Sequence, residues 1–225
     1  MKKDASAVSV IGGADGPTSI FLVGRKEMNI LQRIKASFFN RKYIRKRTRA
    51  ERTIASLAPN AHTIEETIQY IRQRYHAAEA DSSYPLYNSR KRNMKHQLIQ
   101  RNQPELLGEE KQFLPPADLN DKQALLAWQQ KIDAWADECM ARADAVPYDV
   151  FPTDYHLFII DRQDEGTLEV EIDSMNSSLS VSYSGNQKIM EPILKDIYLY
   201  FGVSDEDIAH RSERYLSLLG ALTFD

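Results

Sequence analysis

The sequence predicts an α+β fold: an N-terminal β-hairpin and basic helices, then a helix, a three-stranded antiparallel meander and two C-terminal helices. Apolar residues recur at helical intervals in several long stretches, but alternate with polar residues in three short runs near the C-terminus. Clusters of Gly, Pro, Asn, Asp and Ser separate these stretches. With 225 residues, 42% of them apolar, the chain is long enough to bury a substantial core.

The first elements are two short runs rich in Val, Ile and Phe, residues 6–11 and 18–24. Gly, Asp and Pro separate them, which is typical of a strand, a turn and a second strand. We therefore assign residues 1–24 to an N-terminal hairpin or tag segment.

Residues 25–103 form a basic region that is predicted to be helical. No Pro or Gly interrupts residues 27–57, which indicates one long helix, or two helices with a break near Asn40. Thr63 and Glu66 have the spacing of a capping box at the start of a helix over residues 64–80. A short basic helix is expected over residues 90–102.

Residues 104–120 have few periodic apolar positions and are predicted to be a linker, which places the domain boundary there. An acidic α+β domain over residues 121–225 follows. Its first helix, residues 121–143, can be capped by Asn120. An apolar stripe at helical spacing marks its buried face, formed by Leu125, Trp128, Ile132, Trp135 and Cys139.

Three short strands are expected next, at residues 155–161, 167–173 and 179–184, close enough together for an antiparallel meander. In the second strand Glu169, Glu171 and Asp173 share one face, which we expect to be solvated. The alternatives are a cation site and a docking face for the basic half of the chain. Helices over residues 187–201 and 205–222 complete the domain, and Ser204 with Asp207 suits a helix cap.

Charge is distributed unevenly along the chain. Residues 1–100 hold 19 Lys and Arg against 8 Asp and Glu, whereas residues 101–225 hold 10 against 24. Such opposed blocks indicate either that the halves dock on each other or that each meets a separate charged partner.

The most basic stretch is residues 25–52, with 11 Lys and Arg against 2 acidic residues. It could contact nucleic-acid phosphates, lie on an anionic membrane, bind a protein, or be a solvated or internally paired helix. The candidate contacts to nucleic acid or another anionic partner are Arg41, Lys42, Arg45, Lys46, Arg47 and Arg49.

Catalytic and metal-binding patterns are sparse. The histidines, at positions 62, 76, 96, 156 and 210, form no H-E-x-x-H motif. Cys139 is the only cysteine, so neither an intramolecular disulfide nor a cysteine-based zinc site can form. We assign no catalytic residue and no cofactor, and expect a cytoplasmic protein without a transmembrane segment, for which peripheral membrane contact stays open.

Residues 9–26, SVIGGADGPTSIFLVGRK, form the most distinctive motif. The glycine spacing does not fit a phosphate-binding loop, and Pro17 stands where such a loop has lysine. Residues 11–21, IGGADGPTSIF, resemble a motif of the β subunits of sodium-translocating biotin-dependent decarboxylases. The resemblance implies a sodium-binding role for Asp15, whereas the residues alone predict a hairpin turn.

Together these observations predict a soluble, non-catalytic binding or regulatory protein that acts through a protein partner. One alternative is an accessory or degenerate relative of the decarboxylase β subunits. The other is a nucleic-acid-binding protein that uses the basic helix.

Overall fold

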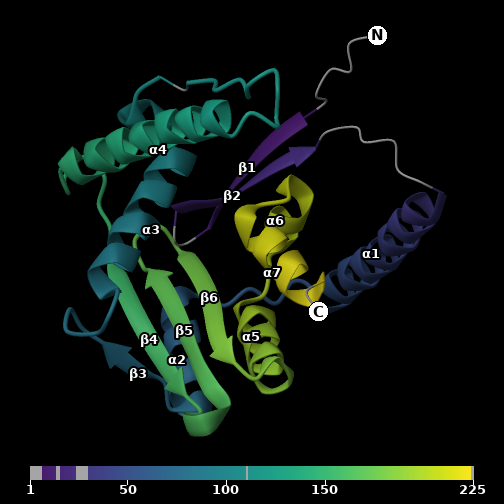
Figure 1. Cartoon of the computed structure of the whole chain (residues 1–225). Helices are drawn as coiled ribbons and strands as arrows, with labels where there is room; N and C mark the ends of the chain where they lie inside the picture. Colours follow the sequence, from purple (N-terminus) through teal and green to yellow (C-terminus); the bar gives the residue numbers. More distant parts are fainter. Residues whose placement is uncertain (1–6, 14–15, 24–29, 110, 224–225) are drawn as a thin grey trace. The chain divides into compact units, whose positions relative to one another are not determined.

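The computed structural model of the chain describes residues 7–13, 16–23, 30–109 and 111–223, with side chains from residue 41 onward (Figure 1). Helices and antiparallel sheets both contribute, which confirms the predicted α+β class. The elements of the N-terminal part are β1 (Ala7–Gly13), β2 (Gly16–Val23), α1 (Ile30–Leu57), α2 (Ile64–Tyr75), β3 (Ala78–Ala80), α3 (Tyr87–Asn102) and the 3-10 helix η1 (Pro104–Leu107). Those that follow are α4 (Lys122–Ala145), β4 (Tyr155–Asp161), the 3-10 helix η2 (Gln163–Glu165), β5 (Gly166–Asp173), β6 (Ser178–Gly185), α5 (Gln187–Phe201), α6 (Asp205–His210) and α7 (Glu213–Thr223).

The chain divides into two compact units, each made of two separate segments. The first combines residues 1–27 with 84–153, and the second combines residues 28–83 with 154–225. This division differs from the predicted ranges, in which 25–103 and 121–225 were continuous regions joined by a linker at 104–120. The difference arises because β3 pairs with β4, which brings residues 78–80 into the sheet of the C-terminal segment.

In the first unit, β1 and β2 pair antiparallel from Ala7 opposite Val23 to Gly13 opposite Gly16. In the same unit, α3 and α4 pack on each other and on η1. Asp121, rather than the predicted Asn120, caps α4 by accepting hydrogen bonds from the backbone of the first turn. The buried side chains of the three packed elements are Met94, Leu98, Ile99, Leu107, Trp128, Ile132, Cys139 and Ala143.

The second unit is built on a four-stranded antiparallel sheet in the order β3-β4-β5-β6. Strands β4, β5 and β6 form the predicted meander, and β3 adds an edge strand that the sequence did not predict. Helices α2 and α5 cover one face of this sheet (Figure 1). The core between them is apolar and includes Ile71, Phe158, Ile160, Leu168, Val170, Ile172, Met190 and Ile197.

Two predicted helices are shorter in the structure. The helix expected over 64–80 ends at Tyr75, because His76 adopts a left-handed conformation with φ of 56° and the chain then enters β3. The helix expected over 205–222 is interrupted at Arg211, which is also left-handed with φ of 49°. Both predicted capping boxes, Thr63 with Glu66 and Ser204 with Asp207, are present.

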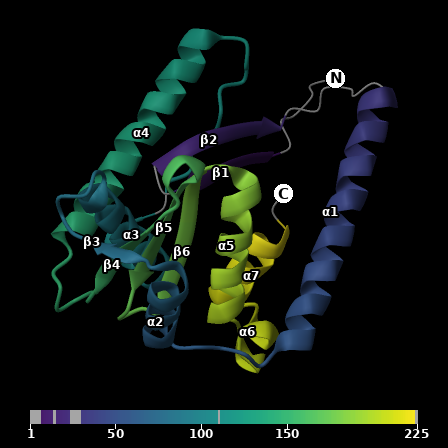
Figure 2. The ribbon, with the colours of Figure 1, turned by 90° about the horizontal axis from the view of Figure 1, so that it is seen from below.

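Helix α1 is continuous through Asn40 and lies beside α7 (Figure 2). Ala50 and Ile54 on α1 pack into a second apolar cluster of this unit, formed with Val203, Tyr215, Leu218 and Leu219. No helix in the described part of the chain is long and apolar enough to cross a lipid bilayer.

A hydrogen-bonded corner joins α1, α2, α5 and α7. Position 202 requires glycine. Its φ is +65°, and a Cβ atom at this position would lie 2.2 Å from the carbonyl oxygen of Asn60. Asn60 donates its backbone N–H to Val203 and its side-chain amide to Leu199, over 3.1 Å each. The Arg214 guanidinium donates to the carbonyls of Gly202, Phe201 and His62, so one α7 side chain closes the corner.

The docking of α1 can be tested with Ile54→Ala. Ile54 is 1% exposed, so truncation should lower the free energy of unfolding by about 2–4 kcal/mol through lost burial and the cavity left behind. Leu57→Ala is the matched control, because Leu57 is 47% exposed on the same helix and should cost under about 0.5 kcal/mol. Urea unfolding followed by circular dichroism measures both, and equal losses would contradict the observed packing.

Candidate functional site

The exposed side of α1 carries a row of four arginines, Arg41, Arg45, Arg49 and Arg52, which we call the arginine stripe. At 3.6 residues per turn and 1.5 Å per residue, the four lie within an arc of about 80° and along about 16 Å of the helix. All four residues are exposed. The spacing of the four arginines in the sequence therefore places their positive charges in a single line along the helix.

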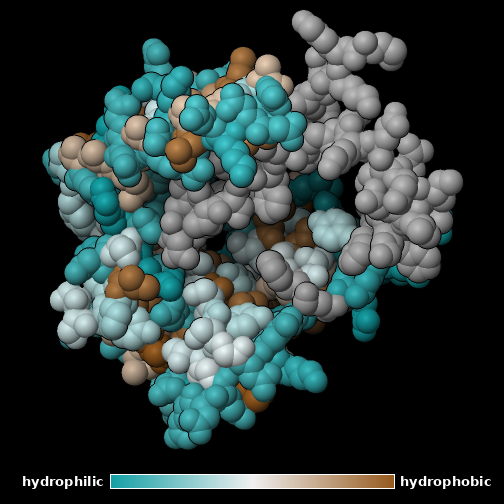
Figure 3. All heavy atoms as spheres, in the orientation of Figure 1, coloured by the Kyte–Doolittle hydropathy of each residue, from teal (hydrophilic) through white to brown (hydrophobic). Residues whose placement is uncertain are grey.

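The stripe lies opposite the docked side of α1. Ala50 and Ile54, which face α7, are centred about 160° around the helix from the middle of the stripe. Packing against α7 thus fixes the helix and leaves the arginines on its outer side. The small part of α1 that is both visible and coloured in the space-filling view is mainly hydrophilic (Figure 3).

The predicted anion-binding residues do not all share this surface. Lys42 and Lys46 flank the stripe, within an arc of about 140° that begins at Arg41. Arg47 lies on another side, with its Nε 3.0 Å from Glu51 Oε1, and the hydrogen bond to that carboxylate raises the pKa of Arg47. Arg52 belongs to the stripe although it was not among the predicted residues. It could have been predicted, because it follows Arg45 by seven residues, which is about two helical turns and places both on one side of the helix.

The arginine stripe is not neutralised within the described chain. Among residues 41–109 and 111–223, no carboxylate forms an ion pair with Arg41, Arg45, Arg49 or Arg52. By contrast, Arg92 of α3 forms an ion pair with Asp144 of α4 at 2.6 Å. The charge of the stripe is therefore available to a partner.

A second polar cluster joins α2 to α5. The hydroxyls of Tyr70 and Tyr75 donate to the same Asp196 oxygen, over 2.5 and 2.6 Å, and the Nε of Arg74 lies 3.1 Å from that oxygen. The Tyr70 ring stacks on Tyr200 at 3.7 Å between centroids. Burial and then the bond to Asp196 raise the pKa of both phenols, so they stay protonated donors. The cluster acts as a tie between two helices.

His156 forms a third cluster at the sheet edge. Its Nδ1 lies 2.7 Å from Glu79 on β3 and its Nε2 3.2 Å from Asp154. Arg72 of α2 also reaches Glu79, over 2.5 Å. Burial lowers the pKa of His156, but the two carboxylates outweigh it and the net shift is upward. Both ring nitrogens are thus engaged in holding the edge strand.

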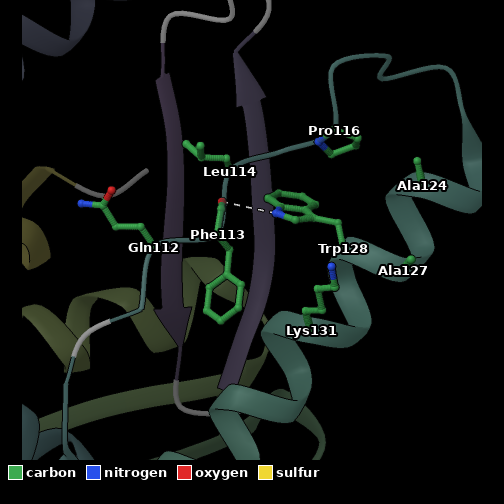
Figure 4. Close-up of a pocket in the computed structure, with 8 residues that line it drawn as sticks. All are labelled: Gln112, Phe113, Leu114, Pro116, Ala124, Ala127, Trp128 and Lys131. Atoms are coloured by element: carbon green, nitrogen blue, oxygen red, sulfur yellow. Dashed lines mark hydrogen bonds between the residues drawn. The ribbon is translucent and has the colours of Figure 1, made fainter.

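A pocket of about 450 Å³ lies between α4 and the segment before it (Figure 4). The indole of Trp128 is directed from α4 toward that segment and donates to the Phe113 carbonyl over 3.3 Å. The pocket is mainly apolar and is lined by Gln112, Phe113, Leu114, Pro116, Ala124, Ala127, Trp128 and Lys131. Such a lining can hold an apolar side chain but offers no nucleophile or acid–base pair.

The remaining candidate groups have structural surroundings. Burial raises the pKa of the Cys139 thiol, which keeps it protonated on the buried side of α4. The expected solvated face of β5 is wrong in part, since Glu171 and Asp173 are buried. Asp173 accepts hydrogen bonds from the backbone of Asp154 and Asn176, and Glu171 from the Tyr155 hydroxyl. No group of three or more His, Cys, Asp or Glu among the described residues could hold a metal ion.

Asp15, the predicted sodium ligand, lies outside the described residues. Comparison with protein-family models, with curated proteins and with solved structures finds no match to this chain. The resemblance of residues 11–21 to the decarboxylase β subunits therefore stays a prediction carried by the motif alone.

The His156 cluster predicts a pH-dependent contribution to stability. Because the folded pKa of His156 is raised, its stabilising effect is complete below the ordinary pKa of about 6.5 and is lost as pH rises through the folded value. The free energy of unfolding should be higher for the wild type than for His156→Gln at pH 5.5. This difference should be up to about 1 kcal/mol smaller at pH 8.5. Urea unfolding at both pH values measures this difference, and a gap that widens at high pH would contradict the assigned carboxylate contacts.

Proposed function

We propose that this chain is a non-catalytic binding protein that holds an anionic macromolecule on the arginine stripe of α1. The observation that carries the proposal is the placement of four exposed arginines, without ion-pair partners in the described chain, opposite the docked side of the helix. Opposite charge attracts such a partner over about 10 Å at moderate salt and speeds its association.

Rigidity supports a binding role. The contacts of Ala50 and Ile54 with α7, and the corner at Asn60, fix the last turns of α1 before any partner arrives. A surface that is already ordered loses less conformational entropy on binding than a free basic segment does. The stripe is thus better suited to binding than the same residues on an unattached helix.

The other polar clusters also favour binding over catalysis. Asp196 accepts from two tyrosines, and both nitrogens of His156 contact carboxylates. Groups that are engaged in this way hold elements together and have no free position for a substrate.

A protein partner bound at the pocket is the second candidate. Leu114, which lines the pocket, is 83% exposed, and Trp128 provides an aromatic wall. An apolar anchor side chain seated against a tryptophan is a common element of protein interfaces.

The sodium interpretation of Asp15 has its own test. If the decarboxylase-like motif binds the ion, the amide and carboxyl signals of Asp15 should shift with sodium and not with equal potassium, and Asp15→Asn should abolish the shift. Isotope-edited NMR measures both responses. Identical responses to the two cations would remove the sodium proposal.

The binding proposal predicts retention of the full-length chain on heparin-agarose at low salt. Arg45→Gln should lower the salt concentration of elution, and the double variant with Arg49→Gln should lower it further, because each lost charge contact weakens binding about fivefold, or about 1 kcal/mol. Arg47→Gln is the matched control, because it removes one positive charge from the same helix but away from the stripe. In the wild type, Arg47 is paired with Glu51. Equal effects of the Arg47 and Arg45 single variants would contradict the assignment of the stripe.

A further inference from the structure

We infer that the partner of the arginine stripe is double-stranded nucleic acid, bound through its phosphate backbone without readout of base sequence. This inference rests on the proposed function and specifies the partner of the same surface. It depends on the density of charge along α1, on the residues that share the stripe's side of the helix, and on the surfaces that α7 already occupies.

The charge density fits a phosphate backbone. The four arginines of the stripe lie along about 16 Å of helix, or one per roughly 4 Å. A nucleic-acid duplex carries one negative charge per about 1.7 Å of its axis. A continuous line of positive charge matches this regular array better than it matches a protein surface, where charges of both signs are interspersed.

The neighbours of the stripe favour phosphate over a protein or a membrane. Between Arg41 and Lys46 around the helix, the other described residues are Thr53 and Ser56, both small and polar. A protein interface centres on aromatic and apolar side chains, and residues 41–57 of α1 place none in this arc. An amphipathic membrane helix must insert its apolar side together with its basic flanks. Ala50 and Ile54 of α1 are already packed against α7, and the exposed Tyr43, Ile44 and Leu57 lie outside the arc of the stripe.

The same arc indicates backbone contact without sequence readout. It contains no Asn, Gln or acidic side chain in the described helix, so adenine and cytosine edges have no matching group. Arginine binds phosphate oxygens through paired N–H donors, and such contacts position a duplex without reading it.

A duplex also fits better than a single strand. Binding of single strands relies on aromatic rings on which successive bases stack. The exposed Tyr43 lies about 160° around α1 from the centre of the stripe, on another side of the helix. Among residues 41–57, the arc of the stripe therefore holds positive charge without an aromatic ring.

Fluorescence anisotropy with two labelled 20-base-pair DNA duplexes of unrelated sequence, and with one single strand of the same length, tests the inference on the full-length chain. Four phosphate contacts, one for each arginine of the stripe, should give a slope of about −4 for log K against log salt between 50 and 200 mM. Both duplexes should bind equally, and more tightly than the single strand.

The variants assign the effect to the stripe. On either duplex Arg45→Gln should make the slope shallower by about 1, and the double variant with Arg49→Gln by about 2, whereas Arg47→Gln should leave it unchanged. Circular dichroism checks that each variant remains folded. Tighter binding to the single strand, a strong preference for one duplex, or equal effects of Arg45→Gln and Arg47→Gln would overturn the inference.

The outcomes also separate this inference from the proposed function. If neither duplex binds at 50 mM salt but retention on heparin still depends on Arg45 and Arg49, the proposed function stands and the nucleic-acid partner is wrong. The partner assignment is also wrong if vesicles containing phosphatidylserine bind through the stripe and the duplexes do not. If heparin, duplexes and vesicles all fail to bind, both proposals are wrong.

Discussion

Arg214 holds together the corner on which the second unit depends. Its guanidinium binds carbonyls at the end of α5 and before α2, and it lies over the Phe201 ring at 3.7 Å. Burial lowers the pKa of Arg214, while nearby Asp207 opposes that effect. Because α1 leads directly into this corner and packs on the helix that carries Arg214, the direction of the arginine stripe follows from an interaction that lies away from it.

Local patterns predicted the elements whose determinants are close in sequence. Alternation in β4, β5 and β6 and the two capping boxes were visible in a few residues each. Strand β3 was not predictable in this way, because Glu79 becomes part of a sheet only by lying opposite Phe158. The break at Arg211 likewise has no Gly or Pro to mark it, and the Ser212 hydroxyl bonded to Asp207 stabilises it.

The charge map predicted the candidate site only in outline. Composition identified the basic helix, but not that Arg47 turns to Glu51 or that Arg52 joins the stripe. Part of the opposed charge is neutralised inside the first unit, where Arg92 pairs with Asp144. Ion pairs formed in the folded chain thus decide which basic residues remain for a partner. Counts of charged residues in the sequence cannot reveal these pairs.

The interleaved segments of the second unit have a consequence for biosynthesis. On the ribosome, α1 and β3 emerge long before β4 and α7, the elements that cover them. Throughout that interval Ala50 and Ile54 face water on a nascent chain whose arginines are already exposed. Contacts between such distant segments close slowly, so this unit completes its folding only after α7 has been translated.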